Sequence, residues 1–271
     1  MLFRSIYLNP VDGQVIILLN GDGIKISPKI FLQGPYNATT GLMNDQLRVL
    51  GLLPKSEPYS ALGMPPTVGE GYQVMDSIQV FSERGSNSIV DWILVELRDK
   101  LVPANVLYSQ PCLLQRDGDI VGLDGVSAVS FDGVQVGEYH VAIKHRNHIG
   151  VRTANPVRLS QLFTNIDFRE GDTAANGTNS MKVLSNGVMA MWAGNANSNA
   201  NVRYSGPAND QNKLLNTCLG GNKTGILNNV YNTCDLNMDG KVRYSGPSND
   251  QNVLLNQVLG GNKTGIINQN F

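Results

Sequence analysis

The last third of the chain contains an internal duplication. Residues 202–229 recur as residues 242–269 at a constant offset of 40 residues, and 22 of the 28 aligned positions are identical. Two copies form a pair rather than a long solenoid, so we expect two half-units that bury their apolar faces against each other. Neither half is expected to fold alone.

Each copy predicts a loop followed by a short helix. Asp210 and Asp250 stand immediately before an apolar leucine pattern, which makes them the predicted N-caps. Glycine pairs at 220–221 and 260–261 end the two patterns, and glycine is the usual residue just beyond a helix C-terminus. We therefore expect helices of two to three turns.

The segment before the second helix has the spacing of a calcium-binding loop. Asp235, Asn237 and Asp239 supply side-chain oxygens at positions 1, 3 and 5, and Gly240 at position 6 permits the sharp turn. Lys241 at position 7 offers its backbone carbonyl. Calcium requires six to eight hard oxygen ligands, so this loop is the predicted Ca²⁺ site.

The ligand expected at position 12 of this loop is missing from its usual place. Position 12 normally carries an acidic residue, and here it is Gly246. Asn249 and Asp250 become candidates if residues 245–248 bulge outward, and we prefer Asp250. The alternative is that Asp250 only caps the helix.

The first copy has a weaker version of the same loop. Amide oxygens replace the carboxylates, and Ala200 replaces the glycine. Because calcium affinity follows the ligand charge, we expect this site to be weak or empty, and an Asn-rich turn that lost the ion is an equal alternative. Its candidate ligands are Asn195, Asn197, Asn199, Asn201 and Asp210.

Upstream, the sequence alternates between strand patterns and turn residues. Period-two patterns of β-branched and aromatic residues occupy residues 29–33, 89–97 and 139–144. Asp-Gly pairs at 117–118, 124–125 and 132–133 are spaced as tight turns between short antiparallel strands. These features predict a mainly β fold with a small α part, an antiparallel β-sandwich of the prealbumin-like or immunoglobulin-like kind.

The N-terminal region predicts one further strand. Residues 14–19 are apolar and follow a turn at residues 9–13. They form an extra sandwich strand or the end of a preceding domain, and an unpaired apolar strand is also a device for self-association. A short helix within residues 44–53 and a Pro/Gly-rich loop at residues 63–70 complete the pattern.

Charge balance and apolar run length limit the classes of binding partner that we expect. Lys plus Arg number 21 against 22 Asp plus Glu, so no sequence-wide field attracts nucleic acid or an anionic membrane. No apolar run reaches the roughly 20 residues of a membrane span. Residues 1–4 do not begin a secretory signal, and we expect either a removed signal or, preferably, a piece cut from a longer protein.

The three cysteines leave two alternatives. Cys218 and Cys234 lie 16 residues apart across the link between the two copies. A disulfide between them and two independent buried thiols are equally weighted.

Other reactive residues are given structural interpretations. His140 and His148 share a face of a strand and His145 faces the other way, so histidines at a strand end that face solvent or pack beside Tyr139 are preferred to a metal site. No nucleophile elbow, phosphate-binding glycine loop or HExxH helix is present, and we expect no catalysis.

The acidic residues of the longest strand are treated in the same way. Asp91, Glu96 and Asp99 are expected on solvated faces. Trp92, on the face opposite Asp91, is the predicted core anchor.

Longer phrases carry a resemblance to known families. The loop–helix pair resembles a type I dockerin, although a hydrophobic cohesin-facing pattern is not evident. Residues from about 25 onward resemble a recurrent C-terminal region of secreted surface proteins of Bacteroidota, in KIFLQGPY at 29–36, VDWILVELR at 90–98, LQRDG at 114–118 and YHVAIKHRNH at 139–148. The resemblance covers about nine tenths of the chain and implies export by the type IX route.

Together these features predict four segments: an N-terminal strand or hairpin (1–24), a β-sandwich (25–170), a linker hairpin (171–192) and the duplicated calcium module (193–271). The expected function is that of a non-catalytic, extracellular structural protein, a filament or scaffold subunit that associates with itself or another surface protein. An adhesion module for glycans or a host protein and a dockerin-type anchor are the alternatives.

Overall fold

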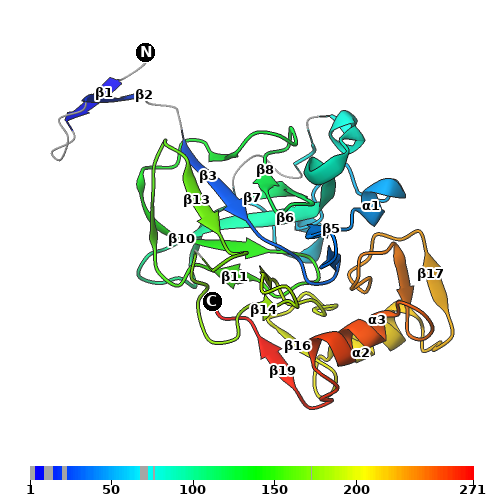
Figure 1. Ribbon diagram of the computed structural model, residues 1–271. Coiled ribbons are helices and arrows are strands. Elements are labelled where there is room, and N and C mark those ends of the chain that lie inside the picture. Colours follow the sequence, from blue (N-terminus) through cyan, green and yellow to red (C-terminus); the bar gives the residue numbers. More distant parts are fainter. Residues whose placement is uncertain (1–3, 9–14, 20–22, 68–72, 76, 172) are drawn as a thin grey trace.

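The structure is a computed structural model that describes residues 4–8, 15–19, 23–67, 73–75, 77–171 and 173–271. It is mainly β, with short helices and mostly antiparallel strand pairs (Figure 1). This confirms the predicted β-rich class. Among the described residues, no helix combines the length and apolar character needed to cross a bilayer.

The largest sheet is built around one long hairpin. Strands β6 (Ile89–Arg98) and β7 (Val106–Gln115) pair along their length, with a bulge between Ile89 and Asp91. The sheet order is β11-β10-β6-β7-β8, with β12 also paired to β10. The remaining strands are β8 (Ile120–Val121), β10 (Gly137–Lys144), β11 (Val151–Arg152) and β12 (Val157–Leu159).

A smaller sheet shares its core with the large one. It contains β13 (Thr164–Asp167), β3 (Ile24–Lys29) and β9 (Val129–Phe131), and β13 runs parallel to β3. Apolar side chains from both sheets form one buried cluster that includes Ile26, Phe131 and the fully buried Trp92, which confirms the predicted anchor. We call residues 23–171 the main body.

The local predictions hold unevenly in the main body. Gly118, Gly125 and Gly133 all adopt positive φ, as the Asp-Gly turns require. The strand predicted at residues 29–33 is wrong in its bounds, because the alternating burial lies in residues 24–29. The short helix exists as α1 (Gln46–Val49), which contacts β6.

The acidic residues of β6 are not on a solvated face. All ten positions of β6 are buried, including Asp91 and Glu96, because both faces of the strand are covered. Glu96 is neutralised there by Arg98, 2.5 Å away. Asp99 closes the following turn by accepting from the backbone N–H groups of Leu101 and Val102.

Short elements complete the main body and lead out of it. They are the hairpin β4 (Tyr36–Asn37) with β5 (Leu42–Met43), and 3₁₀ turns at Ser60–Leu62, Ile78–Ser82 and Gly85–Asn87. The predicted linker hairpin forms from β14 (Lys182–Val183) and β15 (Met189–Ala190).

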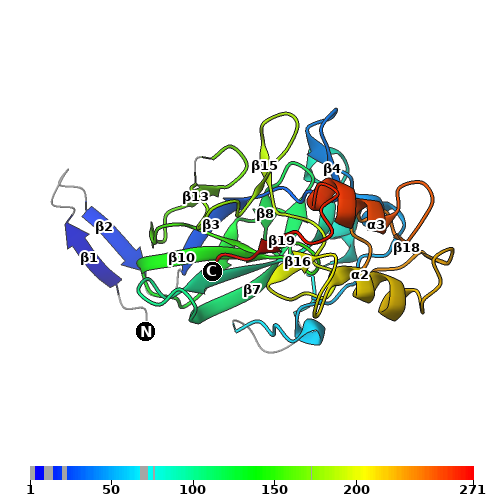
Figure 2. The same ribbon diagram turned by 90° about the horizontal axis from the view of Figure 1, so that it is seen from below.

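The apolar N-terminal strand has a partner. Strand β2 (Val15–Leu19) pairs antiparallel with β1 (Arg4–Leu8), so the expectation of an unpaired strand is wrong. The predicted turn at residues 9–13 lies outside the described residues. Figures 1 and 2 show this hairpin projecting from the main body.

The two copies of the repeat exchange strand pairs. In the first copy, β16 (Asn201–Arg203) pairs with β19 (Ile266–Asn268) of the second. Conversely, β17 (Ile226–Asn228) of the first pairs with β18 (Lys241–Arg243) of the second. Tyr204 and Tyr244 meet between the copies, with their hydroxyl oxygens 3.1 Å apart.

Between its strands each copy contains the predicted helix. These are α2 (Asp210–Asn212) continued by a π-helical turn (Lys213–Cys218), and α3 (Asp250–Asn252) continued by another (Val253–Val258). Leu214, Leu254 and other apolar residues of both copies form one buried cluster. The apolar faces therefore bury each other, as the duplication predicts.

Candidate functional site

The second loop folds its oxygens inward. The Asp235 carboxylate accepts from the backbone N–H groups of Asp239 and Gly240, at 3.0 and 2.9 Å. Asn237 Oδ1 also accepts from the Asp239 N–H (3.1 Å), and Asp239 Oδ1 accepts from the Lys241 N–H (2.9 Å). These bonds wind the segment into a tight turn, and Gly240 adopts φ +80° within it.

Asp250 belongs to this loop rather than to the helix cap. Its carboxylate accepts from the backbone N–H of Leu236 at 2.7 Å and of Arg243 at 2.9 Å. The N-cap is instead Asn249, whose Oδ1 accepts from the Asn252 N–H at 2.7 Å. The prediction of Asp250 as N-cap is therefore wrong, because the carboxylate turns back toward the loop.

The same correction holds in the first copy. Asn209 caps α2 through the Asn212 N–H (2.7 Å), while Asp210 accepts from the Arg203 N–H (2.9 Å). In both copies the aspartate one residue after the cap faces the loop and is fully or almost fully buried.

Burial makes the ionised form of two carboxyl groups in the second loop costly. Burial raises the pKa of Asp235 to about 7, against the lowering effect of Arg146. Burial also raises the pKa of Asp250 well above its usual range, and the charge of Asp235 adds to this shift. Within the described part of the chain, the one loop carboxylate in an ion pair is Asp239, 3.5 Å from Arg243.

The donors suit a hard cation. No three His, Cys, Asp or Glu side chains of the described residues gather into a ready-made metal site. The oxygens that face the loop backbone are instead those of the Asp235 and Asp250 carboxyl groups and the Asn237 amide. Each carboxylate oxygen that accepts one N–H retains a further lone pair, and oxygen donors of this kind are those that calcium prefers.

The first loop satisfies itself. Asn195 Oδ1 accepts from the Asn199 N–H at 3.0 Å, and its Nδ2 donates to the Asn199 carbonyl at 2.6 Å. Asn197 Nδ2 donates to the Ala208 carbonyl (2.6 Å), and Asn201 Oδ1 accepts from Arg203 Nε (2.8 Å). Asn195 thus carries an amide donor at the position where the second loop has the carboxylate of Asp235.

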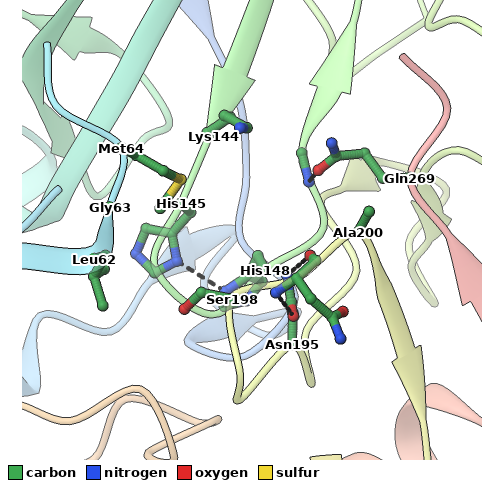
Figure 3. A pocket seen from close by; sticks show the side chains of 12 residues that line it. Leu62, Gly63, Met64, Lys144, His145, His148, Asn195, Ser198, Ala200 and Gln269 are labelled. Atoms are coloured by element: carbon green, nitrogen blue, oxygen red, sulfur yellow. Dashed lines mark hydrogen bonds between the residues drawn. The ribbon is translucent and has the colours of Figure 1, made fainter. Parts of the chain in front are cut away.

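The histidines lie inside the molecule, contrary to expectation. All three are at most 4% exposed. Strand β10 ends at Lys144, so the turn that follows brings His145 and His148 together, whereas His140 bonds separately to the Thr153 carbonyl at 2.9 Å. Figure 3 shows the pair beside a cavity of about 270 Å³ that Asn195, Ser198 and Gln269 also line.

The ring nitrogens of the pair are fully used. His148 Nε2 accepts from the Gly34 N–H (3.1 Å), so its Nδ1 carries the proton and faces His145 Nδ1 (3.1 Å) and Asn147 Oδ1 (2.8 Å). His145 Nδ1 then accepts, and His145 Nε2 donates to Asp91 at 3.1 Å. Burial lowers the pKa of both rings, which keeps them neutral.

Asp91 is the charged centre of this network. Although burial opposes it, Arg146 lowers the pKa of Asp91 to about 2, with help from His145 and Tyr231. Arg146 Nε lies 2.9 Å from the carboxylate, and the Tyr231 hydroxyl donates to it at 2.6 Å. This group was not predicted from the sequence, in which Asp91 and Tyr231 are 140 residues apart.

The disulfide alternative is resolved. Cys218 and Cys234 are joined by a disulfide, which ties the end of the first helix to the residue before the second loop. Cys112 is a free, buried thiol in β7.

No protein-family model, curated protein or solved structure matches this chain.

Proposed function

We propose that this chain is a non-catalytic, extracellular structural protein whose second loop binds one structural calcium ion. The observation that carries the proposal is the convergence of Asp235 and Asp250 on one loop. Both carboxylates are buried, both have raised pKa values, and their backbone bonds hold them ready for a cation. Asn237, Asp239 and the Lys241 carbonyl complete the proposed ligand set.

The finer fold assignment rests on the same features. The two sheets around one core support a β-sandwich of the prealbumin-like or immunoglobulin-like kind. The reciprocal loop–helix copies support a dockerin-like pair, in line with the resemblance of the sequence.

Export is supported by the disulfide between Cys218 and Cys234, because structural disulfides persist in oxidising compartments. The absence of catalysis is supported by the network around Asp91, whose ring nitrogens are all committed to partners within the chain. A general acid or base needs a nitrogen that reaches a substrate.

Among the structural roles we favour a filament or scaffold subunit. The projecting β1–β2 hairpin supports contact with another chain (Figure 2). The outer faces of the two helices carry exposed Asn216, Thr217, Asn256 and Gln257, a polar surface that disfavours a hydrophobic dockerin–cohesin contact. Light scattering across protein concentrations tests this role, and a monomer at every concentration would refute it.

The calcium proposal is tested by metal analysis and calorimetry. The chelator-stripped protein should take up one Ca²⁺ per chain, and the double variant D235N/D250N should take up none. The matched control is N195D, which adds a carboxylate at the corresponding position of the first loop and leaves the proposed ligands intact. A wild-type protein that binds no calcium, and melts identically in EDTA and in calcium, would refute the proposal.

A further inference from the structure

The second loop is held by the main body along its length. Asn147, from the turn after β10, donates its Nδ2–H to the Asp235 carbonyl at 2.7 Å. Gly34 lies against Leu236, the residue after Asp235, and a Cβ added to Gly34 would overlap the Leu236 carbonyl oxygen. At the far end, a Cβ on Gly240 would lie 2.6 Å from Leu50.

Met238, in the middle of the loop, also packs against the main body. Its side chain is 1% exposed and belongs to the hydrophobic cluster of the main body rather than to that of the repeats. Its backbone adopts φ +58°, as does the equivalent Ser198 of the first loop. The main body therefore packs against the curved loop at its centre as well as at both ends.

The holding residues are themselves fixed. Asn147 is fully buried; its Oδ1 meets His148 Nδ1, and its carbonyl accepts from the Asn195 N–H at 3.0 Å. The neighbouring Arg146 donates to the Asn232 carbonyl, just before the loop, while it pairs with Asp91 of β6. A continuous set of buried hydrogen bonds thus joins β6 to the loop.

We propose that Gly34 and Asn147 are positioning residues for the calcium site: the main body pre-forms the loop, and the ion in turn stabilises the main body. This inference rests on the proposed calcium function. A loop held in its binding shape loses less entropy when the ion enters, so contacts outside the repeat raise affinity. By linkage, the ion stabilises whatever contacts enforce that shape.

The test is calorimetry of calcium binding to the full chain and two variants. G34A pushes the Leu236 carbonyl outward and should weaken binding about tenfold, as expected for overpacking against rigid backbone. N147A removes one hydrogen bond to the loop and should weaken binding about three- to tenfold. The matched control is G122A, whose new methyl group would meet its nearest neighbour at an ordinary 3.5 Å and should leave affinity unchanged.

A purely structural role would lower the melting temperature of both variants in EDTA without changing their calcium affinity, and that result overturns the inference. If the variants fail to fold, hydrogen exchange of the wild-type chain decides. Calcium should slow exchange in residues 89–98 and 145–150 as well as in 235–243. Protection confined to residues 193–271 overturns the inference, whereas a wild type without any calcium uptake refutes the underlying function instead.

Discussion

Replacing Asp235 by asparagine should stabilise the metal-free protein and abolish its stabilisation by calcium. The side chain is completely buried, and burial raises the pKa of its carboxyl group to about 7. The folded state therefore retains the proton longer than the unfolded state does. Consequently this carboxylate lowers the stability of the metal-free protein progressively as pH rises from about 4 to about 7, and by a constant amount above that.

The magnitude follows from the shift. A rise of about three pKa units corresponds to roughly 4 kcal/mol of destabilisation at pH 8. The asparagine loses one backbone hydrogen bond, which offsets about 1 kcal/mol. It fits the loop, because Asn195 already occupies the corresponding position of the first copy and donates to the Asn199 carbonyl. We expect D235N to be about 1–3 kcal/mol more stable than wild type in EDTA at pH 8, with the difference shrinking toward pH 4.

Calcium should stabilise the wild type and leave the stability of D235N unchanged. At a free calcium concentration of 100 times Kd, a site of this kind adds about 2.7 kcal/mol, or roughly 5–10 °C in a protein of this size. The wild type should show this increment and D235N should not. Thermal unfolding followed by circular dichroism, in EDTA and in calcium at pH 5 and pH 8, measures both effects. A D235N protein that is less stable than wild type in EDTA, or that retains the calcium increment, would refute the reasoning.

Three further outcomes are expected. The triple variant N195D/N199D/A200G gives the first loop the two carboxylates and the glycine of the second. Calorimetry should show its calcium stoichiometry rising from one to two, and an unchanged value would count against the role of ligand charge. Replacing Cys218 and Cys234 together by serine should cost about 3 kcal/mol in denaturant unfolding, since the bridge closes a loop of 16 residues, and a loss below 1 kcal/mol would contradict this. Y231F removes a hydrogen bond to the buried Asp91 carboxylate and should cost about 1.5–3 kcal/mol in the same assay, whereas an unchanged midpoint would show that Arg146 and His145 suffice.

Features set by local chemistry were predictable from the sequence. The Asp-Gly turns and the helices of the repeats depend on neighbouring residues, and both form as expected. The spacing of Asp235, Asn237 and Asp239 was visible in the same way. The helix caps were assigned one residue too late. Asparagine and aspartate cap equally well, and only the fold shows that Asp250 is drawn to the Leu236 and Arg243 N–H groups.

Features set by long-range packing were not predictable. Asp91 was predicted to be solvated because isolated acidic residues on strands usually face water. Its partners Arg146 and Tyr231 come from distant segments. His145 and His148 were predicted to lie on opposite faces of a continuing strand. Strand β10 stops at Lys144, and the turn that follows brings the two rings together. Burial on both faces of a strand leaves no periodic signal in a single sequence.

The crossed strand pairing of the repeats has a consequence for how such a unit can arise or be dissected. Strand β16 pairs with β19 and β17 pairs with β18, so each strand of one copy pairs with a strand of the other. A lone copy therefore has two unpaired strands. Such a copy can complete its pairing only with a twin molecule. The C-terminal part of this chain thus has the strand pairing of a two-fold dimer within one chain. Cutting the link between the copies and reducing the Cys218–Cys234 disulfide should yield halves that reassemble rather than two independent monomers.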